Sequence, residues 1–142
     1  MGWEKKQGES EEISSLRAIV LFNMGVRGNR QVISEALKKF NSGYENIDPN
    51  LRSVVYKIVL ANHDDQSYFD RFLEIYRSTS MSEERVRILD SLGYISNPSL
   101  FPLLFDFMQS DDVRPQDRIT LLGSISDNPK GRDFAWNYLS EK

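Results

Sequence analysis

The sequence predicts an all-α protein, and three observations lead to this prediction. Apolar residues recur at spacings of three and four along nearly all of the 142 residues, as on one face of a helix. Residues that typically begin or end helices lie between these apolar stripes. No six-residue stretch alternates apolar and polar side chains, and no Asn-Gly or Asp-Gly hairpin turn occurs.

We expect eight helices of about 11–15 residues, joined by links of a few residues. Their expected starts lie near residues 11, 30, 50, 67, 82, 98, 115 and 129. Each helix carries one apolar stripe that we expect to face the core. In chain order the stripes are Ile13, Leu16, Val20 and Met24; Val32, Ile33, Ala36, Leu37 and Phe40; Leu51, Val54, Val55, Ile58 and Val59; Phe69, Phe72, Leu73 and Tyr76; Val86, Leu89 and Leu92; Leu100, Leu103, Leu104 and Phe107; Ile119 and Leu122; and Phe134, Tyr138 and Leu139.

Start and stop signals support these helices in order. Acidic residues from Glu9 to Glu12 favour the positive end of the first helix, and Ser80 with Glu83 has the spacing of a capping box before the fifth. Prolines suit the first position of the last three helices, with asparagine N-caps before two of them; these residues are Pro98, Pro115 and Pro129, with Asn97 and Asn128. Glycines are expected to end helices at Gly25, Gly28, Gly43 and Gly93.

The helix starts predict a repeating architecture. Helix pairs recur at roughly 30–40 residues, the period of α-solenoids. The segments that begin at Asn97-Pro98 and Asn128-Pro129 also share an aromatic pattern. We therefore expect an all-α, right-handed superhelix of about four HEAT-like antiparallel helix pairs, in a chain of single-domain length.

Composition excludes several classes of function. Eighteen basic and 21 acidic residues give a net charge of −3, which argues against a nucleic-acid surface spread over the protein. With no cysteine and one histidine, His63, the chain cannot form a thiolate nucleophile or a two-histidine zinc site. The longest apolar run, around Ile19–Phe22, is far too short for a membrane span. An independent hydrolase is therefore nearly excluded.

The segment Val113–Asp117 is the candidate site. Pro115 fixes a helix start, Asp117 lies in the positive first turn, and Arg114 projects from the preceding link. A guanidinium at that position is suited to hold a carboxylate by two parallel hydrogen bonds. The alternative is a capping arrangement in which Gln116 and Asp117 satisfy exposed backbone N–H groups.

Other candidates have simpler interpretations. His63 lies in a polar link that lacks a second imidazole, and Gly25–Gly28 is better explained as a helix end than as a nucleotide clamp. The aromatic stripe of Tyr68, Phe69, Phe72 and Tyr76 is more typical of core packing than of a ligand site. The basic cluster of Arg27, Arg30, Lys38 and Lys39 is expected to be a solvated face. The acidic cluster of Asp111, Asp112 and Asp117 is expected to mark a helix boundary rather than a calcium site.

Six segments, in order, point to one family. They are Gly2–Glu9 with Leu16-Arg17; Glu35–Phe40; Asp48–Tyr56; Tyr76-Arg77 with Glu83–Leu89; Asp112–Asp117; and Gly131-Arg132 with Ala135-Trp136. In these segments the chain resembles the C-terminal domain of the gluzincin zinc aminopeptidases, the group of the puromycin-sensitive enzyme, aminopeptidase N and the endoplasmic-reticulum aminopeptidases. Asp112–Asp117 is the most specific match.

The resemblance implies a non-catalytic helical domain that caps a separate catalytic domain, forms part of a chamber wall and helps to orient or select peptide substrates. The family's zinc motif HExxH and its GAMEN motif are absent from the 142 residues. Zinc would therefore belong to the catalytic domain of the same parent chain, with no cofactor in this segment. The expected partners are that catalytic domain and a peptide, whose tail Arg114 would contact.

Two further expectations concern the parent chain. The segment would be a fragment of the family domain, truncated at both ends, and the lack of cysteine and of N-glycosylation sequons leans towards a cytoplasmic parent. The alternative function is a free-standing α-solenoid adaptor that binds a protein partner in its concave groove.

Overall fold

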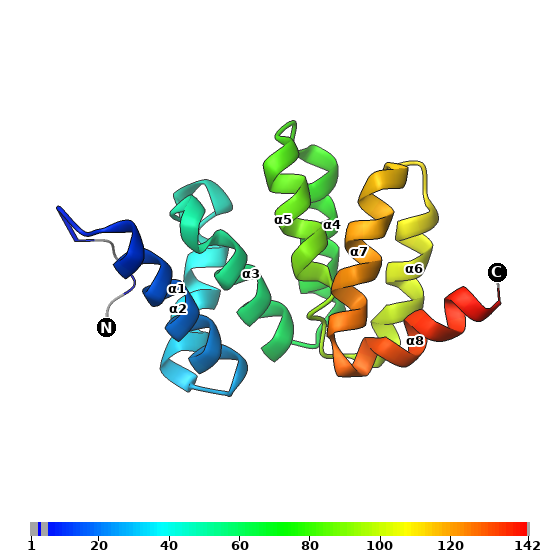
Figure 1. Ribbon diagram of the computed structural model, residues 1–142, viewed down its shortest axis with the longest axis horizontal. Helices are drawn as coiled ribbons and strands as arrows, with labels where there is room; N and C mark the ends of the chain where they lie inside the picture. The colour runs from blue at the N-terminus through cyan, green and yellow to red at the C-terminus, as the bar shows by residue number, and fades with distance from the viewer. Residues whose placement is uncertain (1–2, 4–5, 142) are drawn as a thin grey trace. The chain divides into compact units, whose positions relative to one another are not determined.

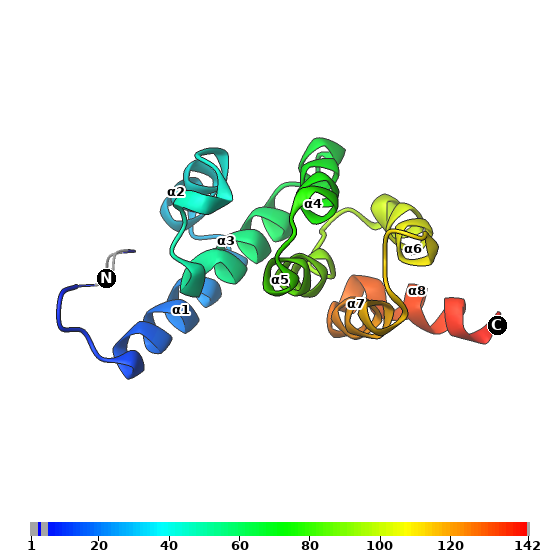
Figure 2. The ribbon, with the colours of Figure 1, turned by 90° about the horizontal axis from the view of Figure 1, so that it is seen from above.

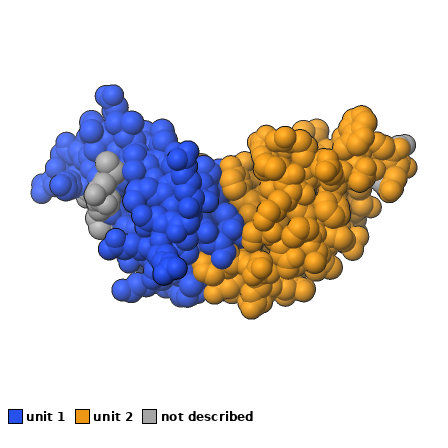
Figure 3. All heavy atoms as spheres, turned by 90° about the horizontal axis from the view of Figure 1, so that it is seen from below, with its two compact units in different colours: residues 1–62 blue, residues 63–142 orange. Residues whose placement is uncertain are grey.

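The protein is all-helical, as the sequence predicts. The computed structural model describes residues 3 and 6–141, and these contain eight α-helices, two 3-10 helices and no strand (Figure 1). Gly2, Glu4 and Lys5, which belong to the first segment of the family resemblance, lie outside the described residues. The chain divides into two compact units, Met1–Asn62 and His63–Lys142 (Figure 3).

Unit 1 consists of three α-helices and one short 3-10 helix. They are α1 (Glu11–Val26), α2 (Arg30–Asn41), η1 (Tyr44–Asn46) and α3 (Pro49–Asn62). Both α1 and α2 pack against α3, which lies between them in Figure 2. Helix α3 is accordingly buried over most of its surface, with Val55, Ile58 and Val59 fully inaccessible. Two of its partners in the core are Val32 and Phe40 of α2, in agreement with the predicted stripes.

The prediction for the buried face of α1 is wrong. Its predicted stripe is exposed, with Ile13 at 45% and Leu16 at 46% of full exposure, and Val20 and Met24 only slightly less. The buried residues of α1 are Arg17, Leu21 and Gly25. This face lies one residue, or about 100°, further round the helix. It is favoured because Gly25 allows a close approach to α3, which the neighbouring Met24 would prevent.

A buried ion pair fixes the N-terminal segment to α1. The Arg17 guanidinium donates hydrogen bonds to both carboxylate oxygens of Glu9, and the Ser14 hydroxyl donates to the same carboxylate at 2.8 Å. Both side chains of the pair are about 95% buried. The hydrogen bonds from Arg17, followed by that from Ser14, lower the pKa of Glu9 from 4.5 to about 2.

Unit 2 contains five α-helices and one 3-10 turn. They are α4 (Gln66–Ser78), α5 (Ser82–Leu92), η2 (Pro98–Leu100), α6 (Phe101–Gln109), α7 (Pro115–Asp127) and α8 (Pro129–Ser140). Within this unit, α4 and α6 lie in one row and α5 and α7 in a second row, with α5 packed against α7 (Figure 2). Its core includes most of the predicted stripe residues of α4 to α6, whereas Ile119, Phe134 and Leu139 are exposed, contrary to the prediction.

The asparagine-proline starts are confirmed. The side chain of Asn97 accepts a hydrogen bond from Ser99 N at 3.0 Å, and that of Asn128 accepts from Lys130 N at 2.9 Å. The first of these starts is a 3-10 turn rather than the α-helical turn that we expected. The cause is Pro102, which has no N–H to donate to the carbonyl of residue 98. Phe101 N donates to Pro98 O instead, and α6 follows.

The capping box predicted at Ser80 and Glu83 is wrong. Helix α5 begins at Ser82 with Met81 as its N-cap, and no side chain caps it. The hydroxyl of Thr79 accepts a hydrogen bond from Met81 N at 3.2 Å, which stabilises the link one residue before the predicted cap. Helix α5 is held mainly by its packing rather than by an N-cap.

The four predicted glycine stops have two different roles. Gly28 and Gly43 follow α1 and α2 with φ angles of 95° and 102°, a conformation that favours glycine, so they end helices as expected. Gly93 is the C-cap of α5, as expected, whereas Gly25 lies within α1 and does not end it. A Cβ on Gly25 would lie 2.5 Å from Ile58 Cδ1, and one on Gly93 would overlap the backbone of Ser124. These two glycines permit close helix packing.

A repeated side-chain contact supports a structural period. Asparagine side chains donate to a backbone carbonyl 33–37 residues earlier: Asn62 to Gly25 at 3.0 Å, Asn97 to Asp64 at 3.2 Å, and Asn128 to Ile95 at 3.1 Å. Each asparagine lies at a helix end and bonds to the last turn of an earlier helix or to the link after one. The period matches the one that the helix starts predict.

Candidate functional site

Arg114 lies in the link between α6 and α7, directly before Pro115. Its backbone is extended, and its carbonyl accepts hydrogen bonds from Asp117 N at 2.9 Å and Arg118 N at 3.1 Å. The start of α7 is therefore held by backbone contacts and by Pro115. The capping alternative is wrong for the described residues, because neither Gln116 nor Asp117 forms a side-chain cap.

The Arg114 guanidinium is bound to the described residues only through its Nε. Its Nε donates to Asp117 Oδ2 at 3.1 Å, and Asp117 is almost fully buried whereas the Arg114 side chain is 46% exposed. No other hydrogen bond of Arg114 is formed with residues of the described chain, so its two Nη groups face no protein acceptor there. A guanidinium held by Nε with its Nη edge unoccupied is arranged for a two-pronged bond to a carboxylate.

Tyr76 of α4 forms a hydrogen bond with Asp117. Its hydroxyl donates to Asp117 Oδ2 over a long 3.4 Å, and its ring packs edge-on against Phe107 with centroids 5.3 Å apart. Burial, together with the nearby Asp117 carboxylate, raises the pKa of Tyr76. The tyrosine therefore stays protonated as a donor, and it fixes the carboxylate that orients Arg114.

Two further arginines lie near this site. Arg85 of α5 has its guanidinium 5.8 Å from the centre of the Tyr76 ring, and Arg118 Nη2 donates to Ser110 O at 3.4 Å. The Nε atoms of both arginines are buried and have no hydrogen-bond partner among the described residues. Buried donors without partners are rare, and these two lie beside Tyr76 and Ser110, near Arg114.

The structure brings together part of the predicted site. Arg114 and Asp117 form its centre, whereas the Gln116 side chain is exposed and forms no hydrogen bond with the described residues. Sequence reasoning missed Tyr76, Arg85 and Arg118 as members of the site. Arg118 follows Arg114 by four residues, a helical spacing that could have indicated it. The other two come from different helices, and no local pattern places them here.

The aromatic stripe packs in the core, whereas His63 and the basic cluster lie nearer the surface. His63 is half-buried, with its ring 5.0 Å from that of Tyr68. Phe69, Phe72 and Tyr76 are buried core residues. Lys39 of the basic cluster lies over the ring of Trp3, at 5.6 Å from its centroid. In the described ranges no three His, Cys, Asp or Glu side chains are grouped as a metal site would need, and no described helix is long and apolar enough to cross a membrane.

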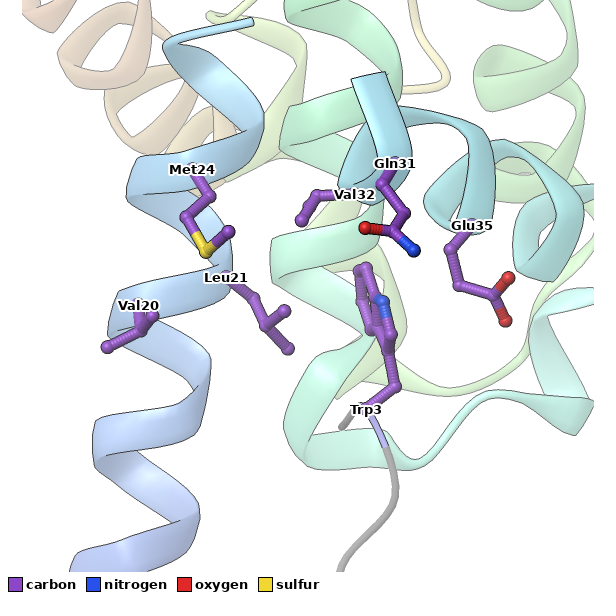
Figure 4. A pocket seen from close by; sticks show the side chains of 7 residues that line it. All are labelled: Trp3, Val20, Leu21, Met24, Gln31, Val32 and Glu35. Carbon is purple, nitrogen blue, oxygen red and sulfur yellow. The ribbon is translucent and has the colours of Figure 1, made fainter. Parts of the chain in front are cut away.

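Unit 1 contains a groove of about 430 Å³ between α1 and α2 (Figure 4). Its α1 wall carries Val20, Leu21 and Met24, and Trp3 stands against the opposite side. Only Gln31 and Glu35 of the lining side chains offer polar groups for recognition, apart from the indole N–H. The groove is continuous with the exposed apolar stripe of α1, which makes it a packing surface rather than a reactive site.

Comparisons with known proteins identify the family. Residues 1–142 match the ERAP1-like C-terminal domain. The chain belongs to this family. It is 35% identical to Aminopeptidase M1 of Arabidopsis thaliana and 33% identical to Aminopeptidase M1-A of Oryza sativa subsp. japonica, in each case over the whole chain but only 17% of the relative. Glutamyl aminopeptidase of Mus musculus is 27% identical over 98% of the chain and 15% of its own length.

This ERAP1-like C-terminal domain thus spans about a sixth of the curated relatives that it matches. The family resemblance drawn from the six segments is confirmed. The candidate site lies in the segment Asp112–Asp117, the most specific part of that resemblance. The relatives are aminopeptidases, and this chain corresponds only to their C-terminal domain.

Proposed function

We propose that this chain is the non-catalytic C-terminal helical domain of a zinc aminopeptidase that removes N-terminal residues from peptides. The match of the whole chain to the ERAP1-like C-terminal domain supports this proposal. The zinc ion would be held by the catalytic domain, because the 142 residues contain one histidine and no cysteine. The domain would act on the reaction by forming part of the chamber wall and by binding the substrate away from the scissile bond.

The observation that carries the substrate role is the geometry of Arg114. Its Nε is held by Asp117, its Nη edge has no acceptor among the described residues, and nearly half of the side chain is exposed. In our proposal this edge receives the C-terminal carboxylate of the peptide. The side chain is ordered before the ligand arrives, so little conformational entropy is lost on binding.

The architecture in this proposal is a superhelix of HEAT-like pairs. The asparagine contacts that recur at separations of 33–37 residues support it, as do the two helix rows of unit 2. The catalytic domain of the same polypeptide would cover the apolar stripe of α1, formed by Ile13, Leu16, Val20 and Met24. Such a contiguous apolar face typically marks a contact with another protein surface. A cytoplasmic location stays a prediction from composition.

The α1 stripe also fits the alternative function, a free-standing adaptor that binds a protein partner. The two proposals differ at Arg114, because an adaptor that binds through α1 has no need of a carboxylate site in unit 2. A substrate experiment at Arg114 therefore separates them.

The test uses the full-length enzyme with Arg114→Ala and Arg114→Lys. We expect kcat/KM for peptides of about nine residues with a free C-terminus to fall roughly tenfold or more, the scale of a charged hydrogen bond. Turnover of small aminoacyl chromogenic substrates should not change. The Lys variant keeps a positive charge beside Asp117, so it separates loss of the two-pronged bond from loss of the ion pair.

Arg132→Ala is the matched control, since Arg132 is an exposed arginine of α8 whose Nε donates to Ser126 O at 3.1 Å. It should leave both substrate classes unaffected. Equal losses for long and small substrates in the Arg114 variants would overturn the proposed role.

A further inference from the structure

A second arginine next to the candidate site is also bound to an aspartate through its Nε. Arg77, in the last turn of α4, donates from Nε to Asp112 Oδ2 at 3.0 Å. Its guanidinium lies over the ring of Phe107, 5.5 Å from the centroid. Apart from this contact and its aspartate, Arg77 has no partner in the described residues. Its Nη edge is therefore as unoccupied as that of Arg114.

The two arginine–aspartate pairs are neighbours in the fold. Asp112 and Arg114 flank Val113, which is buried at 1% exposure, whereas both flanking residues are exposed. Two residues of chain span at most about 7 Å, so the backbones that carry the two pairs are close. Phe107 links the two pairs, because its ring contacts Arg77 of one pair and the ring of Tyr76, which bonds to Asp117 of the other.

The Arg77 pair is also easy to rearrange. Its two side chains are 52% and 50% exposed, and exposed pairs of this kind contribute little stability. The pair can therefore open at little cost in stability and release the Arg77 guanidinium to an incoming carboxylate. Two further arginines lie close to the pairs: Arg85 lies over the Tyr76 ring, and Arg118 donates to Ser110 O.

We infer that Arg77 and Arg114 form a paired-guanidinium site for peptides that end in glutamate or aspartate, an inference that rests on the proposed role of Arg114. Such a residue carries two carboxylates. The α-carboxylate binds the Nη edge of Arg114, and the side-chain carboxylate binds that of Arg77. The substrate class of the domain is therefore peptides with an acidic C-terminal residue.

Calorimetric binding to the 142-residue chain tests this inference with three peptides of identical sequence except at the C-terminus. They end in glutamic acid, in glutamine with a free α-carboxylate, and in glutamic acid amide. Each peptide is measured with the unmodified chain, Arg77→Gln, Arg114→Lys and, as a control, Arg132→Gln. Circular dichroism confirms that each variant keeps its helices.

With the unmodified chain we expect the glutamine peptide to bind roughly three- to tenfold more weakly than the glutamic acid peptide. Arg77→Gln should abolish that difference while preserving the preference for a free α-carboxylate over the amide. Arg114→Lys should reduce the preference for the free α-carboxylate, because an ammonium group keeps the charge but cannot form the two-pronged bond. Arg132→Gln should change neither preference.

The outcomes separate this inference from the proposed function. If the glutamic acid and glutamine peptides bind equally, or if Arg77→Gln weakens both by the same factor, the paired site is wrong while the role of Arg114 stands. If the free acid and the amide bind equally to the unmodified chain, both are overturned.

Discussion

Unit 1 and unit 2 use their exposed side chains in different ways. In unit 1 the outer face of α1 is a stripe of large apolar side chains beside a groove lined by Val20, Leu21 and Met24. In unit 2 the ends of α4 and α6 and the starts of α5 and α7 bring arginines to one place. An apolar stripe is suited to another protein surface, and ordered guanidinium groups are suited to an anion.

The units also differ in how closely their helices approach. In unit 1 the three atoms nearest to a Cβ on Gly25 all belong to the side chain of Ile58, at 2.5–3.0 Å. In unit 2 a Cβ on Gly93 would meet the backbone of Ser124, and the Ser124 hydroxyl donates to Asp90 O at the same contact. The close approach in unit 2 therefore joins backbone to backbone, whereas that in unit 1 joins backbone to a side chain.

The largest expected effect tests which face of α1 is buried. Leu21→Ala removes a side chain that is only 2% exposed and should lower the free energy of unfolding by about 2–5 kcal/mol. Leu16→Ala, on the exposed stripe of the same helix, should change it by no more than about 0.5 kcal/mol. Urea unfolding followed by circular dichroism measures both. Similar losses would mean that the isolated chain buries both faces.

A smaller effect is expected where α5 approaches α7. Gly93→Ala should destabilise the chain by about 1–3 kcal/mol, because the backbone of Ser124 cannot move aside cheaply. Gly123→Ala is the matched control. It lies within α7 with open space around its Cβ position, so it should stabilise the chain by about 0.5–1 kcal/mol. Thermal unfolding of the two variants should show shifts of opposite sign, and a shared sign would contradict the close approach.

The smallest effect is a pH dependence specific to unit 1. The pKa of Glu9 is about 2 in the folded chain and 4.5 where its hydrogen-bond partners are absent, as in the unfolded chain. The unfolded chain therefore binds more protons than the folded chain between these two pH values. The stability that Glu9 contributes is present above pH 4.5 and is lost as the pH falls towards 2. Denaturant midpoints of the native chain and Glu9→Gln should therefore converge over this window.

Glu12→Gln is the control for that titration, because Glu12 is an exposed carboxyl in the first turn of the same helix. Its midpoint should follow that of the native chain throughout the window. A constant gap between the native chain and Glu9→Gln down to pH 2 would show that Glu9 has no lowered pKa.

Much of the fold follows from local signals in the sequence. Pro115, Asn97 and Asn128 begin helices as expected, because a proline ring and an N-cap act on backbone groups within a few residues. Gly28 and Gly43 end helices through their own backbone conformation. The central pair of the candidate site, Arg114 and Asp117, was also found from its position at a helix start.

Only the tertiary structure decided which surfaces meet. The stripe of α1 has the right spacing for a core, yet the packing of Gly25 on Ile58 selects the adjacent face. Tyr76 reaches Asp117 across 41 residues, and Arg77 reaches Asp112 across 35. Most helix starts depend on neighbours along the chain, so the sequence determines them by itself, although the capping box predicted before α5 does not form. Buried faces and the arginine site depend on residues brought together from separate helices, and only packing determines those.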